Sequence, residues 1–318
     1  MFTYLRLHLA LKPAGSGDSA SFAGPRIRRV LGKALIEGFC PFGEPRCQPR
    51  PQRGKPAPAH ELCDLARSCP YGVLFAASSA GRPPFSLFLP PPRGHDEPQG
   101  LELTLYGEGC AMYSWAVLSL QRALRQGLGK ERRGWEITEI LRVQPDRRVE
   151  SLCNGDLTAL TSNLTPDVLG LGIEPYLAHQ PVEVRLLSPT RLLEGGKLLP
   201  GHAPVPLRLL VARVLDRFRS LFGDDASEIL HPGIREVIEA QADQVRLLVD
   251  ETEWREVADY SARSRSELLL GGKVGRLVYG EEAAPFFPIL RAGEVLHVGK
   301  NTTSGCGRIA VDLLGADS

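Results

Sequence analysis

A glycine-rich segment near the carboxyl end, residues 294–311 (EVLHVGKNTTSGCGRIAV), combines residue types that suit phosphate binding. Glycine has no Cβ, so its backbone can turn with positive φ and approach a ligand closely. A lysine adds a point charge, while hydroxyls and backbone N–H groups can donate to phosphate oxygens. The residues expected to bind in this way are Gly299, Lys300, Asn301, Thr302, Thr303, Gly305, Gly307 and Arg308.

The segment has two other interpretations, a P-loop and a tight connection. A P-loop is excluded, because no G-x-x-x-x-G-K-[ST] string occurs and the segment precedes an expected strand instead of opening a helix. A tight connection, in which the glycines only make room for neighbouring protein, stays open.

Histidine is the obvious general base among the seven in the chain, because its unperturbed pKa of about 6.5 lies near working pH. His297 lies three residues before Lys300, so it could approach a phosphate that the segment holds. We therefore select His297 and Lys300 as the catalytic candidates. The alternative is that His297 hydrogen-bonds the segment into shape. His8 and His60 are interpreted as ordinary surface side chains.

Four cysteines, Cys40, Cys47, Cys63 and Cys69, follow the spacing C-x6-C-x15-C-x5-C. Four thiolates can hold a structural zinc ion that pins a long loop. The spacings are wider than in common zinc motifs, so four free thiols are the alternative. No cofactor is expected to take part in catalysis.

The first half of the chain shows the order β-α-β-β-α-β, the pattern of a ferredoxin-like domain. Alternation predicts a strand at residues 2–11, and Pro25 suits the first turn of an amphipathic helix over residues 24–38. Arginines, among them Arg28 and Arg29, cover the solvent side of that helix. The other elements expected in this half are strands at 84–91, 101–107 and 135–143 and a helix at 113–124.

The second half repeats this order around an acidic helical insertion at residues 224–250. The elements expected here are strands at 182–188, 259–264, 271–280 and 307–314 and helices at 205–222 and 283–293. Each half then places a basic, glycine-rich segment before its last strand, at 127–134 and 299–307. The sequence therefore predicts an α+β protein with two tandem ferredoxin-like (RRM-like) domains at 1–150 and 181–318, joined by a linker at 151–180. One large α/β domain is the alternative.

Charge is distributed unevenly although the formal net charge is only +1. Residues 1–60 carry ten Lys/Arg against three Asp/Glu, so part of the surface could meet a polyanion. The sequence contains no run of 18 apolar residues, so no membrane-spanning helix is expected. Its first residues alternate between apolar and polar as in a strand, which does not fit a signal peptide. The odd number of cysteines, seven, argues against a secreted disulfide scaffold, so a cytoplasmic protein is expected.

Several stretches resemble the CRISPR precursor-RNA processing endoribonucleases of the RAMP superfamily. In the second half these are "SPTRLLEGGKLL", "YSARSRSELLLGGKVGRLVYG" and "APFFPILRAGEVLHVGKNTTSGCGRI". In the first half they are "CPYGVLF", "PFSLFLPPP" and "GLGKERRGWEI". The resemblance implies two ferredoxin-like folds and a role in antiviral defence. It also implies that the glycine segment grips CRISPR repeat RNA.

The resemblance further implies metal-independent cleavage, in which a ribose 2′-OH attacks the neighbouring phosphate and leaves 2′,3′-cyclic phosphate and 5′-OH ends. The chain departs from the family pattern, because residues 25–59, where the catalytic histidine is usual, contain no histidine. Arg28 and Arg29 are expected to contact RNA, and with Arg26 they offer a substitute for that histidine. The missing histidine also favours a rival, a non-catalytic RAMP subunit that binds RNA within a CRISPR effector complex.

Overall fold

The computed structural model divides the chain into two compact units, which are described separately. It describes residues 1–13, 24–42, 63–76, 82–90, 99–127, 134–157, 160, 164–174, 180–223, 226, 230–261 and 266–315. One unit comprises Thr3–Phe85 and Pro91–Asp167, and the other comprises Met1–Phe2, Ser86–Pro90 and Val168–Ser318. The predicted domain limits at 1–150, 151–180 and 181–318 stay a prediction.

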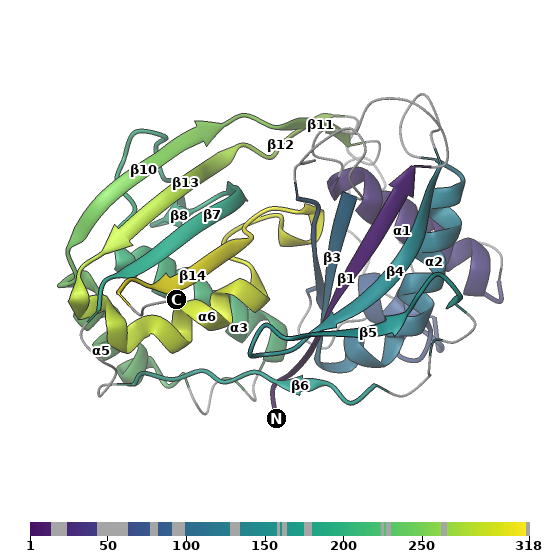
Figure 1. Cartoon of the computed structure of the whole chain (residues 1–318), viewed down its shortest axis with the longest axis horizontal. Helices are drawn as coiled ribbons and strands as arrows, with labels where there is room; N and C mark the ends of the chain where they lie inside the picture. The colour runs from purple at the N-terminus through teal and green to yellow at the C-terminus, as the bar shows by residue number, and fades with distance from the viewer. Residues whose placement is uncertain are drawn as a thin grey trace. The chain divides into compact units, whose positions relative to one another are not determined.

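The N-terminal sheet has the strand order β2-β3-β1-β4-β5. Its strands are β1 (Thr3–Pro13), β2 (Phe85–Phe88), β3 (Gln99–Tyr106), β4 (Trp135–Val143) and β5 (Val149–Cys153), and the short β6 (Asp167–Val168) also pairs with β1. The first four strands have the order of a ferredoxin-like fold, with β1 antiparallel to both β3 and β4. Helices α1 (Gly24–Phe39) and α2 (Tyr113–Arg125) lie against one face of this sheet (Figure 1).

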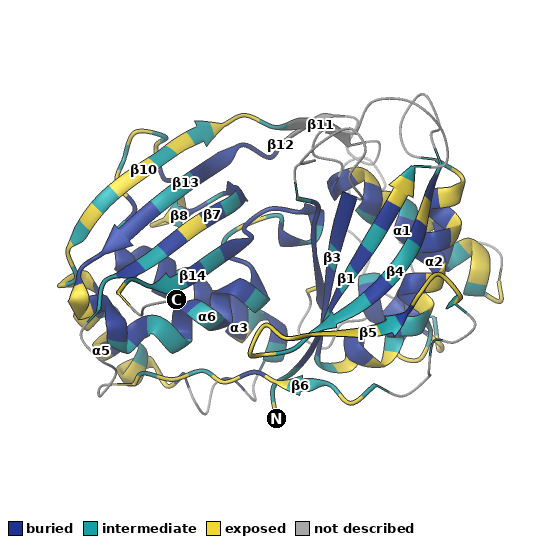
Figure 2. Ribbon diagram, in the orientation of Figure 1, coloured by how far each residue is buried: buried dark blue, intermediate teal, exposed yellow. Residues whose placement is uncertain are grey.

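Apolar periodicity explains how these elements pack. Leu5, Leu7 and Leu9 of β1 are fully buried, whereas His8, between Leu7 and Leu9, is only half-buried. Figure 2 shows buried and half-buried residues along β1. Ile27, Leu31 and Leu35, one stripe of α1, are also fully buried. Two short helical segments, Gly72–Ala76 and Gly107–Met112, complete the unit.

The C-terminal sheet has the strand order β10-β13-β7-β14. Its strands are β7 (Val182–Thr190), β10 (Leu247–Arg255), β13 (Gly272–Tyr279) and β14 (Ile309–Leu313). Helices α3 (Leu207–Phe222) and α6 (Phe287–Leu296) lie behind this sheet, and α5 (Pro232–Asp243) packs against α3 (Figure 1). Two hairpins, β8 (Leu193–Glu194) with β9 (Lys197–Leu198) and β11 (Ala258–Ser261) with β12 (Ser266–Leu269), lie outside the sheet. The α+β fold with two tandem ferredoxin-like domains is therefore confirmed.

The second strand of this sheet corrects the sequence analysis. A helical insertion was expected over residues 224–250, but α5 ends at Asp243 and the edge strand β10 begins at Leu247. The strand expected at 259–264 corresponds to β11, which pairs with β12 instead of joining the sheet. Every residue of β10 is exposed or half-buried, so neither face of the strand is buried. Without a buried face, its sequence lacks the alternation of apolar and polar residues by which a strand is predicted.

The described residues form no helix that is long and apolar enough to cross a bilayer. Most of the basic segment at 127–134 lies outside the described residues.

Candidate functional site: the glycine loop

The candidate site is the glycine loop, residues 297–308, which joins α6 to β14. It contains one short helical turn, Thr302–Ser304, which begins after Asn301 and ends at Gly305, both in the left-handed backbone region. Hydrogen bonds hold this turn closed, since the N–H groups of Ser304 and Cys306 both donate to the Asn301 carbonyl oxygen at 2.8 and 3.3 Å. The loop is therefore a defined structure.

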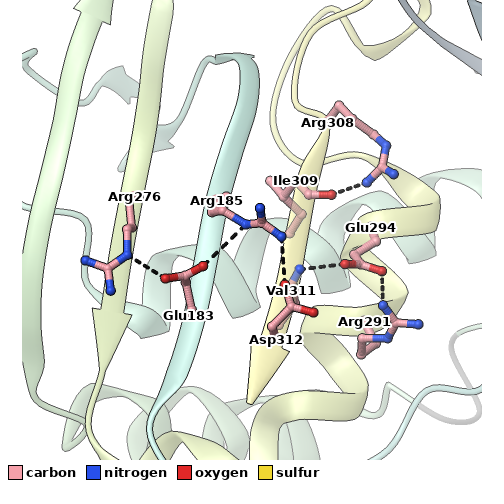
Figure 3. A network of polar contacts seen from close by, with 9 residues as sticks. All are labelled: Glu183, Arg185, Arg276, Arg291, Glu294, Arg308, Ile309, Val311 and Asp312. Atoms are coloured by element: carbon pink, nitrogen blue, oxygen red, sulfur yellow. Dashed lines mark hydrogen bonds and ion pairs between the residues drawn. The ribbon is translucent and has the colours of Figure 1, made fainter. Parts of the chain in front are cut away.

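A buried carboxylate fixes the two elements that flank the loop. Glu294 of α6 is only 4% exposed and accepts a hydrogen bond from the Val311 N–H of β14 at 2.5 Å (Figure 3). Its second carboxylate oxygen is paired with the guanidinium of Arg291 (Figure 3). A buried carboxylate needs such partners, because an unpaired charge inside a protein is costly. The helix and the strand are thus joined at the root of the loop.

His297 lies at this root and is 1% exposed. Its backbone has a positive φ of 60°, and its N–H donates to the Gly293 carbonyl oxygen at 3.0 Å. Its ring Nδ1 lies 3.3 Å from the Cys306 carbonyl oxygen, across the loop. Since a carbonyl oxygen only accepts, Nδ1 carries the proton in this contact. This placement favours the loop-shaping role of His297 that the sequence analysis left open.

Two glycines of the loop make room for protein backbone. A Cβ at Gly299 would lie 2.4 Å from the Arg191 carbonyl oxygen, and a Cβ at Gly307 would lie 2.0 Å from the Val298 carbonyl oxygen. Both have positive φ, 88° and 75°. The tight-connection interpretation therefore accounts for these two positions, and an RNA contact by them stays a prediction.

The tip of the loop is its accessible part. Lys300 is exposed, while Asn301 and Thr303 are half-buried. Thr302 and Arg308 are 4% and 5% exposed, and the Arg308 guanidinium donates to the Ile309 carbonyl oxygen (Figure 3). Lys300, Asn301 and Thr303 are therefore the predicted RNA-binding residues that a ligand could reach at the tip, and their contact with RNA stays a prediction.

The open face of the C-terminal sheet carries arginines that are already paired. Glu183 accepts from Arg276 at 2.5 Å and lies 3.3 Å from Arg185, and Arg185 also bonds Asp312 at 2.8 Å (Figure 3). Carboxylates therefore compensate the cations along β13, β7 and β14. This compensation makes the face a poor surface for binding phosphate.

The remaining candidates for proton transfer and RNA contact are dispersed. His8 lies on β1, where its ring occupies the space above Gly100. His60 lies outside the described residues. Arg29 of α1 is exposed, and the Arg28 guanidinium lies 5.3 Å from the ring centre of Phe75, a cation–π contact. None of these groups belongs to the same unit as the glycine loop.

Three of the four early cysteines line one small pocket. Cys40, Cys63 and Cys69 share it with apolar side chains such as Leu35 and Tyr71, and Cys47 lies outside the described residues. The Cys69 sulfur accepts the Gly72 N–H at 3.1 Å. Where the structure describes the chain, no three His, Cys, Asp or Glu residues form a group that could hold a metal ion. The structural zinc stays a prediction.

Sequence reasoning missed the residues that support the loop from the end of β7. The N–H of Gly307 donates to the Pro189 carbonyl oxygen at 3.1 Å, and the N–H of Lys300 donates to the Arg191 carbonyl oxygen at 3.2 Å. Ser188 accepts the Arg308 N–H at 2.9 Å. Only the stretch "SPTRLLEGGKLL", noted for its family resemblance, pointed to this region.

The fold and the basic-tipped loop define a RAMP-type protein with two ferredoxin-like domains. Residues 184–309 match the profile of the CRISPR-associated endoribonuclease Cas6, and residues 2–164 match that of the AF_1859_N N-terminal domain. The Cas6 match lies in the second half of the chain, and it supports a CRISPR-associated, RAMP-like processing endoribonuclease.

Solved structures share the fold over nearly the whole chain. A Cas6 (TTHB231) product complex has 16% identity and a TM-score of 0.55, with 98% of this chain and 99% of that chain covered. Thermus thermophilus Cas6 (TTHB231) has 15% identity and a TM-score of 0.53, with the same coverage. A Cas6 (TTHA0078) product complex has 18% identity and a TM-score of 0.50, with 98% and 100% covered. No curated protein sequence matches the chain.

Proposed function

We propose that this chain cleaves the repeat RNA of CRISPR precursor transcripts and so releases guide RNAs. The observation that carries the proposal is the match of residues 184–309 to the Cas6 profile, a range that takes in the whole glycine loop. The exposed Lys300 at the tip of that loop supports it, because a cation there can meet an RNA phosphate. Two of the similar solved structures are Cas6 product complexes.

The proposed chemistry is a metal-independent transesterification within the RNA. The ribose 2′-oxygen attacks the adjacent phosphorus, a base takes the 2′-OH proton, and a new O2′–P bond forms. The P–O5′ bond breaks, and the departing 5′-oxygen receives a proton. The products are a 2′,3′-cyclic phosphate and a 5′-OH. Such a reaction needs an in-line backbone and stabilisation of the developing negative charge.

We assign the charge stabilisation to Lys300 and the shape of the loop to His297. Lys300 presents an ammonium group at the surface, whereas the ring of His297 is buried and bonded across the loop. If His297 shapes the loop, His297→Ala lowers both RNA affinity and cleavage, and His297→Gln, which keeps a hydrogen-bond donor, restores part of each. If His297 is the base, both variants bind RNA normally and lose single-turnover cleavage.

The proposed function also implies which molecules this chain binds. A chain of a solved Cas6-RT-Cas1--Cas2 complex shares the fold with a TM-score of 0.55 and 11% identity, and the match covers 29% of that chain. For this chain we propose repeat RNA as the main partner and other CRISPR subunits as secondary ones.

The test is cleavage of the cognate repeat RNA by the purified chain in EDTA. We expect one cut per repeat, a cyclic phosphate end, and no cut when a 2′-deoxy nucleotide replaces the ribose before the scissile bond, because the nucleophile is then missing. Tight binding of the repeat without any cut would instead support the non-catalytic RAMP subunit. Cleavage that needs added metal would contradict the proposed chemistry.

A further inference from the structure

We infer that Arg191, just after β7, is a positioning residue that holds the glycine loop in its RNA-binding shape. This inference rests on the proposed function, because it concerns how the loop meets RNA. Arg191 itself is half-buried and lies far from the loop in the sequence.

The backbone of Arg191 contacts the loop directly. Its carbonyl oxygen accepts the N–H of Lys300 at 3.2 Å. The same carbonyl group lies against Gly299, where a Cβ would approach the oxygen to 2.4 Å. The residue that carries the exposed cation of the tip is therefore anchored by its main chain to Arg191.

The side chain of Arg191 reaches a third segment. Its guanidinium donates to the Gly271 carbonyl oxygen, just before β13, at 3.0 Å. The loop touches the neighbouring residue there, since the Cys306 sulfur lies 3.9 Å from the Leu270 carbonyl oxygen. Arg191 thus joins the end of β7, the start of β13 and the loop.

Electrostatics agree with this placement. Burial raises the pKa of the Cys306 thiol to about 12, and the positive charge of Arg191 opposes that rise. The guanidinium therefore acts within the loop's own surroundings. Because the Arg191 guanidinium donates to a protein carbonyl oxygen, we infer that it stabilises the structure of the loop.

The consequence for RNA is geometric. Lys300 can meet a phosphate only where its backbone places it, and small displacements at such sites can lower rates by about 10²-fold. When the Arg191 guanidinium is removed, residue 191, which directly follows β7, loses its hydrogen bond to the Gly271 carbonyl oxygen. Lys300 then samples more positions.

Arg191→Gln and Arg191→Lys test the inference, with Arg246→Gln as the matched control, since Arg246 makes an exposed ion pair with Glu282. The first readout, hydrogen exchange of the amides in residues 299–307, needs no RNA. We expect faster exchange in Arg191→Gln, partial recovery in Arg191→Lys and no change in the control. Unchanged exchange in Arg191→Gln, with the melting temperature kept, would overturn the inference.

The second readout is a double-mutant cycle on repeat-RNA affinity with Lys300→Ala. Loss of a hydrogen bond from a charged group predicts about tenfold weaker binding for Arg191→Gln. If Arg191 acts through Lys300, the double variant binds no more than twofold worse than Lys300→Ala alone. Fully additive losses would show that Arg191 contacts RNA itself and would overturn the positioning role. Should the unaltered chain not bind the repeat at all, the proposed function fails, while hydrogen exchange still decides the role of Arg191.

Discussion

At the scale of single residues, Lys300 is the exposed cation of the glycine loop, and the proposed RNA contact depends on it. Its backbone is held by Arg191, whereas its side chain is exposed to solvent. The site therefore combines a fixed main chain with one accessible cation.

Lys300→Ala is expected to weaken repeat-RNA binding and to flatten its salt dependence. Removing one phosphate contact lowers the slope of log K against log salt by about 0.7 to 0.9. Titrations at several salt concentrations measure this, and Lys197→Ala is the matched control, because Lys197 is an exposed lysine of the β8–β9 hairpin. A slope identical to that of the unaltered chain would remove Lys300 from the phosphate contacts.

The cysteines are expected to differ in reactivity. Burial raises the pKa of Cys110 and Cys306 to about 12, so both stay protonated and slow to alkylate at pH 8. Cys40, Cys63 and Cys69 are half-buried and should label first. Peptide mass spectrometry after timed alkylation resolves the two groups.

The same experiment tests the zinc prediction. Thiolates that hold zinc are poor nucleophiles, so added zinc should slow the labelling of Cys40, Cys63 and Cys69 and leave Cys110 unaffected. Equal labelling with and without zinc, together with metal-free protein by elemental analysis, would refute a zinc site.

At the scale of elements, the loop depends on glycine where backbones meet. Gly307→Ala places a Cβ 2.0 Å from the Val298 carbonyl oxygen at φ 75°, whereas Gly196→Ala in the β8–β9 turn has φ 81° and open space. In both variants, an alanine in the left-handed backbone region costs about 1–2 kcal/mol of stability. Only Gly307→Ala must also move the loop, so denaturant unfolding should show the larger loss there. Equal losses would contradict the role of close packing.

The periodicity of apolar residues in the sequence was sufficient to predict the helices and strands that bury one face. The alternating leucines of β1 and the apolar stripe of α1 follow directly from burial on one side. It failed for β10, an acidic edge strand with little buried surface. It found the glycine loop by composition, but not the support from Arg191, because hydrogen bonds between distant segments leave no local signal.

At the scale of the whole molecule, exposed basic residues occur in both units. Arg29 is exposed on α1 in one unit, and Lys300 is exposed in the other. The near-neutral net charge of +1 therefore conceals local positive surface.

We expect the effects of Arg29→Gln and Lys300→Ala on RNA affinity to add. The two residues belong to different units, and additivity within about 0.5 kcal/mol is usual for independent sites. Binding titrations of the two single variants and the double variant measure it. A double variant no weaker than Lys300→Ala alone would mean that the α1 arginine takes no part in holding RNA.

The carboxylate of Glu294 has a consequence beyond the loop. Strand β14 is an edge strand in the described order of its sheet. The main-chain N–H and C=O groups of an edge strand can pair with a strand from another protein chain. Glu294 already occupies the Val311 amide. A further strand that paired with β14 at Val311 would first have to displace this buried, ion-paired carboxylate, so the side chain that secures the root of the loop also hinders the addition of a strand at this position.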